Sequence, residues 1–227
     1  SADKLNSDAN SRQIFLPNGH APMPGKMHHQ PALAKSLRVV AEKGDIGFYQ
    51  GEVAEQMVAY LQSRGGLHTL DDFASTNADY VDPISIDYRG YEIVECPPNG
   101  QGMIALEIFN ILKGFDLSPL QPIGVERLHI EAEATRLAFR DRAAFLADPS
   151  QADVPVEHLL SNSYADELRK LINIDRAMGK MPHPGETAHA DTVYLTVVDG
   201  ERNAVSFINS IFHSFGSGLL DAQTGVL

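Results

Sequence analysis

The 227-residue sequence contains no tryptophan and only one cysteine, Cys96. A single cysteine excludes a disulfide bond within the chain. Because no obvious base stands next to Cys96 in the sequence, we predict a small buried apolar side chain rather than a nucleophile. The cysteine content therefore indicates neither a disulfide-stabilised scaffold nor thiol chemistry.

Basic residues are also few. The chain has 18 Lys and Arg against 30 Asp and Glu, which gives a formal net charge of −12. Proteins that bind nucleic acid need a basic surface for the phosphates, and anionic membrane surfaces attract the same residues. We therefore expect neither a nucleic acid nor a membrane as a partner.

Long apolar runs are missing as well. No stretch approaches the roughly 20 apolar residues that cross a bilayer. The first residues, "SADKLNSDANSRQIF", lack both an initiator methionine and the pattern of a signal peptide. We expect both features if the sequence is a piece of a longer protein, and the sequence does not indicate a compartment. With 43% hydrophobic and 21% charged residues, the composition is globular.

Helical and strand periodicities cover most of the chain after residue 30. Residues 1–30 are polar and rich in Pro and Gly, and we predict irregular structure there. We predict helices at 31–44, 51–66, 69–75, 100–115, 124–149 and 162–172, and β-hairpins at 83–98 and 192–209. Helices and hairpins in this order indicate an α+β or layered α/β protein rather than a βαβ sheet.

Two groups of chemically capable residues have plainer interpretations. His20, His28 and His29 match no helical or finger-type ligand spacing, which favours solvated loop histidines. Glu131 and Glu133 lie two residues apart in a predicted helix with arginines nearby, which favours a charged outer face over an acid–base pair. We therefore predict no metal site and no cofactor.

Thr192 occupies a more informative position. It follows a segment rich in Pro, His and Gly and begins the apolar run "TVYLTVVD". A threonine at a new N-terminus carries a nucleophilic hydroxyl and, in its own α-amine, a base for that hydroxyl. Cleavage before Thr192 would need an accessible preceding segment, which this one provides. β-Branched threonine is also common at strand starts, so the residues alone leave both interpretations open.

Five collinear pieces, which span the chain from about residue 15, are informative together: "LAKSLRVVAEKGDIGFYQGEVAEQMV", "GGLHTLDDFAS", "DYRGYEIVECPPNGQG", "EAEATRLAFRDRAAFLADP" and "DTVYLTVVDGERNAVSFINSIFHSFGSG". In these pieces the chain resembles the γ-glutamyltranspeptidase family of N-terminal-nucleophile hydrolases. The resemblance implies self-cleavage between Asp191 and Thr192, with Thr192 as the catalytic nucleophile. Residues 1–191 would then be the C-terminal part of a large subunit, and 192–227 the start of a small subunit, the two forming a heterodimer.

The resemblance also implies a fold and a support for the nucleophile. We expect a four-layer αββα sandwich in the intact protein, with the 192–209 hairpin central in one sheet and helices 101–113 and 123–147 covering it. The turn "DGER" centres the hairpin near residue 201, so Thr192 and Ser210 should lie opposite each other. We expect Ser210 within hydrogen-bonding reach of Thr192, or, as a plainer alternative, bonded only to a backbone group.

Two positions depart from the family pattern and leave three functions open. Ser210 stands where the family usually has threonine, and Phe212 stands where many members have an asparagine near the glutamyl carboxylate. The first function is a γ-glutamyl transferase or hydrolase acting on glutathione-like amides through an acyl-threonine. The second is an acylase for another acyl group, of the cephalosporin or glutaryl type, which Phe212 favours. The third is an uncleaved binding relative without activity.

Overall fold

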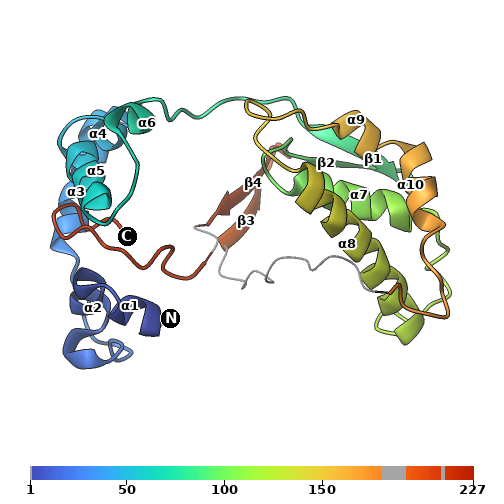
Figure 1. Ribbon diagram of the computed structural model, residues 1–227, viewed down its shortest axis with the longest axis horizontal. Coiled ribbons are helices and arrows are strands. Elements are labelled where there is room, and N and C mark those ends of the chain that lie inside the picture. The colour runs from blue at the N-terminus through green and yellow to red at the C-terminus, as the bar shows by residue number, and fades with distance from the viewer. Residues whose placement is uncertain (1, 180–192, 211–212) are drawn as a thin grey trace. The chain divides into compact units, whose positions relative to one another are not determined.

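The structure is a computed structural model and describes residues 2–179, 193–210 and 213–227 (Figure 1). The chain divides into two compact units, one of residues 79–187 and one that combines residues 1–78 with residues 188–227. No helix within the described ranges is long and apolar enough to cross a membrane. The division into units differs from the predicted processing boundary at residue 192, which stays a prediction.

The N-terminal 30 residues are not irregular throughout, so that prediction was wrong for their first half. They form α1 (Ala2–Asn6), α2 (Ala9–Phe15) and the short 3₁₀ helix η1 (Pro17–Gly19). Asp8 caps α2, since its carboxylate accepts a hydrogen bond from the Ser11 amide at 2.8 Å. Leu5 and Leu16 are buried. The cap and this burial stabilise helices too short to persist alone.

The predicted helices of the first unit are present. They are α3 (Pro31–Lys43), α5 (Glu52–Ser63) and α6 (Leu70–Ala74), with the short α4 (Ile46–Tyr49) between the first two. Pro31 opens α3, and Gly44 ends it with a positive φ of 69°. Thr69 and Asp72 form a reciprocal capping box at the start of α6.

The second unit is built around the hairpin of β1 (Ile84–Tyr88) and β2 (Tyr91–Glu95). The two turn residues, Arg89 and Gly90, both have positive φ, which suits the right-handed twist of the strands. The helices are α7 (Gly102–Leu112), α8 (Val125–Phe145), the short α9 (Val156–Leu159) and α10 (Asn162–Arg169). α7 packs against β1, β2, α8 and α10 (Figure 1).

α8 faces the core of this unit with positions spaced by three and four residues. The buried positions are Ile130, Glu133, Ala134, Leu137, Ala138 and Asp141. The spacing is that of one helix face, as an amphipathic helix requires. Two of the six positions carry carboxylates, which a stripe of hydrophobic residues would not predict.

The second hairpin belongs to the first unit and consists of β3 (Val193–Val198) and β4 (Ala204–Asn209). In the described residues these strands form a separate two-stranded sheet. From residue 195 on, its apolar side chains are exposed, including Leu195 at 42%, Val197 at 55% and Phe207 at 49%. The helices predicted to cover this hairpin, α7 and α8, belong to the other unit, and α7 packs on β1–β2. A central position for β3–β4 in a larger sheet stays a prediction for the intact protein.

Candidate active site

The predicted pairing of the β3–β4 hairpin is confirmed. Val193 pairs with Asn209, and the antiparallel register continues to the pair of Val198 with Ala204. Every pair is therefore centred on residue 201, as the turn sequence indicates. The register fixes which residues at the open end of the hairpin lie opposite each other.

Asp199 organises the turn that sets this register. Its Oδ1 accepts hydrogen bonds from the amides of Glu201 and Asn203, both at 2.9 Å, and its Oδ2 accepts one from Asn203 Nδ2 at 2.9 Å. These bonds, with that from the Asn203 side chain first, lower the pKa of Asp199. Arg202 takes a positive φ of 67°. Such bonds from an Asp side chain to the following backbone are typical of tight turns.

The predicted site residues flank the hairpin in the sequence, and the structure describes only Ser210 among them. Ser210 directly follows β4 and is exposed. Asp191, Thr192 and Phe212 lie outside the described residues. The predicted hydrogen bond between Ser210 and Thr192 therefore stays a prediction.

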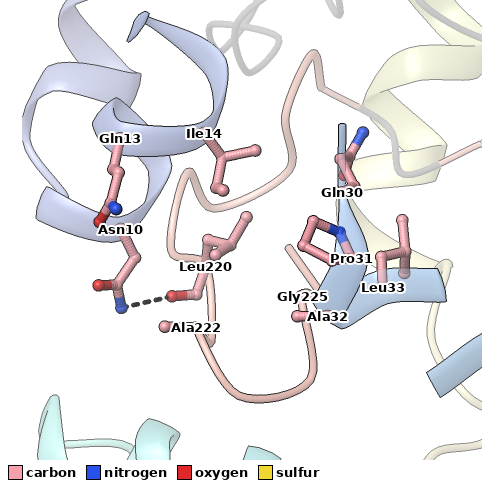
Figure 2. A pocket seen from close by; sticks show the side chains of 10 residues that line it. All are labelled: Asn10, Gln13, Ile14, Gln30, Pro31, Ala32, Leu33, Leu220, Ala222 and Gly225. Atoms are coloured by element: carbon pink, nitrogen blue, oxygen red, sulfur yellow. Dashed lines mark hydrogen bonds between the residues drawn. The ribbon is translucent and has the colours of Figure 1, made fainter. Parts of the chain in front are cut away.

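Residues 214–227, which follow the hairpin, bind to the N-terminal helices of the same unit. Asn10 Nδ2 donates to the carbonyl oxygen of Leu220 at 2.9 Å, and Ser11 Oγ donates to that of Gly218 at 2.7 Å. Figure 2 shows Asn10 and Leu220 beside a cavity of about 160 Å³ between α2, the start of α3 and residues 220–225. The N-terminal helices therefore hold the chain that leaves the candidate site.

Asp8 is the centre of this arrangement and was missed in the sequence. Besides capping α2, its carboxylate accepts hydrogen bonds from Tyr60 Oη at 2.9 Å and from the Leu220 amide at 3.4 Å, and Arg64 Nη2 lies 3.5 Å away. Burial by itself raises the pKa of Asp8, but hydrogen bonds from Ser11, Tyr60 and Leu220 outweigh it and lower the pKa overall. An "Asp-x-x-Ser" cap signal was present in the sequence, but its partners in α5 and at residue 220 were not visible.

Two predictions about side chains outside the candidate site were wrong. Cys96 is exposed rather than buried, because it follows the end of β2 at the surface. Glu133 does not belong to an outer charged face: it is 2% exposed and accepts hydrogen bonds from Arg136 Nη1 at 2.6 Å and the Met178 amide at 2.8 Å. Its position in the inward-facing stripe of α8 decided this.

Metal ligands do not gather in the part of the chain that the structure describes: no group of three or more His, Cys, Asp or Glu side chains is found there. His28 instead stacks on Phe15, with ring centroids 5.9 Å apart.

Comparison with known proteins finds relatives along the whole chain. The family model described as gamma-glutamyltranspeptidase matches residues 1–227. A glutathione hydrolase-like YwrD proenzyme of Bacillus subtilis is 40% identical over 98% of this chain and 42% of its own length. A glutathione hydrolase proenzyme of Pseudomonas sp. strain A14 is 36% identical over 96% of this chain and 39% of its own length.

A solved structure extends this similarity to the fold. The cephalosporin acylase from Bacillus halodurans is 40% identical and superposes with a TM-score of 0.84 over 99% of this chain and 41% of its own. The match confirms the predicted α+β fold class of the N-terminal-nucleophile hydrolases. The chain spans about two fifths of the length of these relatives. The chain belongs to the γ-glutamyltranspeptidase family.

Proposed function

We propose that the protein containing this chain cuts itself between Asp191 and Thr192, and that the freed Thr192 is the nucleophile of an amide-splitting enzyme. The substrates are γ-glutamyl amides of the glutathione type. The register of β3 with β4 carries this proposal. Continued by one pair beyond Val193 and Asn209, it would set Thr192 opposite Ser210.

The self-cleavage needs a hydroxyl and an assisting group. Thr192 Oγ1 attacks the carbonyl carbon of Asp191, and the acyl group moves from nitrogen to oxygen as the peptide C–N bond breaks. Water then hydrolyses the resulting ester, which leaves the Asp191 carboxylate and a free Thr192 amine. The α-amine cannot act as base at this stage because it is still in the peptide bond. Ser210 is the candidate assistant, since a hydroxyl both donates and accepts hydrogen bonds.

Substrate turnover reuses the same hydroxyl. The freed α-amine of Thr192 accepts the hydroxyl proton while Oγ1 attacks the γ-glutamyl carbonyl. The amine product leaves with a proton, and an acyl-threonine ester remains. Water or an acceptor amine then releases the acyl group, giving hydrolysis or transfer. The names of two relatives, both glutathione hydrolase-type proenzymes, support this substrate class and the processing.

A second candidate substrate class is an acyl group of the cephalosporin or glutaryl type. The observations that favour it are Phe212, which cannot hydrogen-bond the α-amine or the carboxylate of a glutamyl group, and the similarity to the cephalosporin acylase. Both classes share the nucleophile and the self-cleavage, so they differ only in what binds beside the scissile amide.

Gel electrophoresis and turnover of the full-length protein test the proposal. We expect two chains, the smaller beginning at Thr192 by N-terminal sequencing, and faster turnover of a γ-glutamyl anilide than of a glutaryl anilide. The reverse preference would assign the protein to the acylases. A single uncut chain that splits neither substrate would show an inactive relative, and the proposal would be wrong.

A further inference from the structure

Residues 214–227 form a segment of loops and turns that contacts α1, α2 and α3 in the first unit. We refer to it as the 214–227 segment. It begins four residues after Ser210 and ends with a turn in which Asp221 Oδ2 accepts hydrogen bonds from the Thr224 hydroxyl at 2.7 Å and the Thr224 amide at 3.2 Å. The segment thus has a defined shape of its own.

The N-terminal helices recognise the main chain of this segment. Four side chains donate to its carbonyl oxygens: Lys4 to Ser214 at 3.3 Å and to Gly216 at 2.9 Å, Asn10 to Leu220 at 2.9 Å, Ser11 to Gly218 at 2.7 Å and Ser36 to Thr224 at 2.7 Å. Asp8 accepts the Leu220 amide. All of these bonds join residues before position 192 to residues after it.

Three of these six hydrogen bonds, those of Ser11, Ser36 and Asp8, are buried from water. Ser11 is 0% exposed, Thr224 1%, and Asp8 and Leu220 2% each. A buried polar group that loses its partner keeps the cost of desolvation without the hydrogen bond. Separating the segment from the helices would therefore leave several buried donors and acceptors unpaired until water entered.

Close backbone contact adds a requirement for shape. A Cβ atom on Gly225 would lie 2.3 Å from the backbone nitrogen of Leu33 at the start of α3, and Gly225 also has a positive φ of 71°. A Cβ on Gly218 would meet the flexible side chain of Lys4, at 2.6 Å. Gly225 is therefore the position where a single added methyl group most directly separates the segment from α3.

We propose that the 214–227 segment anchors the small subunit to the large subunit after the chain is cut before Thr192. The surface of α1, α2 and α3 is the receptor, and the main chain of the segment is its ligand. The inference rests on the proposed cleavage, because only a cut converts these contacts into an interface between two chains. The cavity in Figure 2 lies at this interface, lined by α2, by the start of α3 and, between them, by Leu220, Ala222 and Gly225.

The test measures how fast the small subunit leaves an immobilised large subunit in the cut full-length protein at a fixed sub-denaturing urea concentration. We expect Gly225→Ala to speed release about tenfold or more, the factor for losing one well-buried contact. Gly200→Ala is the matched control, because a Cβ there meets nothing within 4 Å. Equal release rates for the two variants and the unmodified protein would overturn the proposal.

A second pair of variants guards against a misfolded Gly225→Ala protein. Ser11→Ala removes the buried donor to Gly218 and should also speed release, whereas Ser7→Ala removes an exposed hydroxyl that bonds only within the N-terminal helices, to Lys4. Should the protein prove to be uncut, the proposed cleavage fails, and the same comparison is made on two co-expressed chains divided before Thr192. Release from those chains unaffected by Gly225→Ala and Ser11→Ala would overturn the anchor itself.

Discussion

The carboxyl groups of Glu107 on α7 and Asp141 on α8 face each other in the core of the second unit. The two residues are 1% and 2% exposed. Asp141 accepts hydrogen bonds from Arg140 Nε at 2.7 Å and from Tyr164 Oη at 2.7 Å. Neither oxygen of Glu107 accepts a hydrogen bond from any described donor. If Glu107 is protonated, its carboxyl group has a hydrogen-bond partner, because it can donate to the Asp141 carboxylate.

Burial, followed by the hydrogen bond and the charge of Asp141, raises the pKa of Glu107 to about 9, against a smaller lowering by Arg140. The folded protein therefore keeps the proton of Glu107 at pH values where the unfolded chain releases it, above about 4.5, the ordinary pKa of a glutamate side chain. This contribution to stability is complete below that pH and is lost as the pH rises towards about 9.

Glu107→Gln should remove this pH dependence. The amide stays neutral and can still donate to Asp141. As the pH rises from 5 to 9, the free energy of unfolding of the variant should therefore increase relative to that of the unmodified protein. Urea denaturation across this range measures the difference. Glu167→Gln, at an exposed position on α10, is the control and should run parallel to the unmodified protein. Parallel curves for Glu107→Gln would contradict the shared proton.

Asp8→Ala should lower the free energy of unfolding by about 2–4 kcal/mol, since it removes a helix cap and buried charged hydrogen bonds to Tyr60 and Leu220. Because folding lowers the pKa of Asp8, its contribution is present above its ordinary value of 3.8 and is lost as the pH falls through the folded value. Urea denaturation near neutral pH measures the loss. Asp3→Ala, an exposed carboxylate on α1, should change stability little.

Thr192→Ala should leave the full-length precursor as one chain and lower amidase activity by about a thousandfold or more, because no hydroxyl remains to attack. Thr192→Ser should cut more slowly and keep some turnover. Gel electrophoresis and an anilide assay measure both. Separation of the Thr192→Ala protein into chains at residue 192 would show that an outside protease does the cutting. Retained activity in that intact variant would remove Thr192 as the nucleophile.

Ser210→Ala should slow self-cleavage by about 10- to 100-fold, the rate equivalent of one lost hydrogen bond to the reacting hydroxyl. Ser210→Thr should restore cutting, since it returns a hydroxyl. The fraction of uncut precursor over time measures the rate. Ser206→Ala, at an exposed position on β4, is the control. Unchanged cutting in Ser210→Ala would favour the plainer role, a bond to a backbone group.

Phe212→Asn should raise turnover of a γ-glutamyl anilide relative to a glutaryl anilide, because the amide oxygen of asparagine can accept a hydrogen bond from the α-amine of a glutamyl group, which a glutaryl group lacks, while phenylalanine cannot. The ratio of kcat/KM for the two substrates is the measurement. Phe207→Asn, on β4, tests whether loss of an aromatic ring alone changes the ratio. An unchanged ratio in Phe212→Asn would separate this position from substrate choice.

Local signals in the sequence determined much of this protein. Helical spacing and caps predicted α3, α5, α7, α8 and α10, and turn residues predicted both hairpins. The "DGER" turn even determined the register of β3 with β4, because hairpin pairing follows from the turn at its centre. The resemblance of five collinear sequence pieces, the last of them beginning at the predicted processing site, indicated the family.

Only the tertiary structure decided which polar residues are buried and with what they pair. Asp8, which caps α2, also accepts a hydrogen bond from the amide of Leu220, more than two hundred residues away in the sequence. Glu107 and Glu133 occupy inward helix positions that sequence patterns assign to apolar or exposed side chains. Such positions depend on which donors and acceptors distant segments bring together. Local periodicity carries no information about those partners, so their burial, pairing and protonation follow from packing alone.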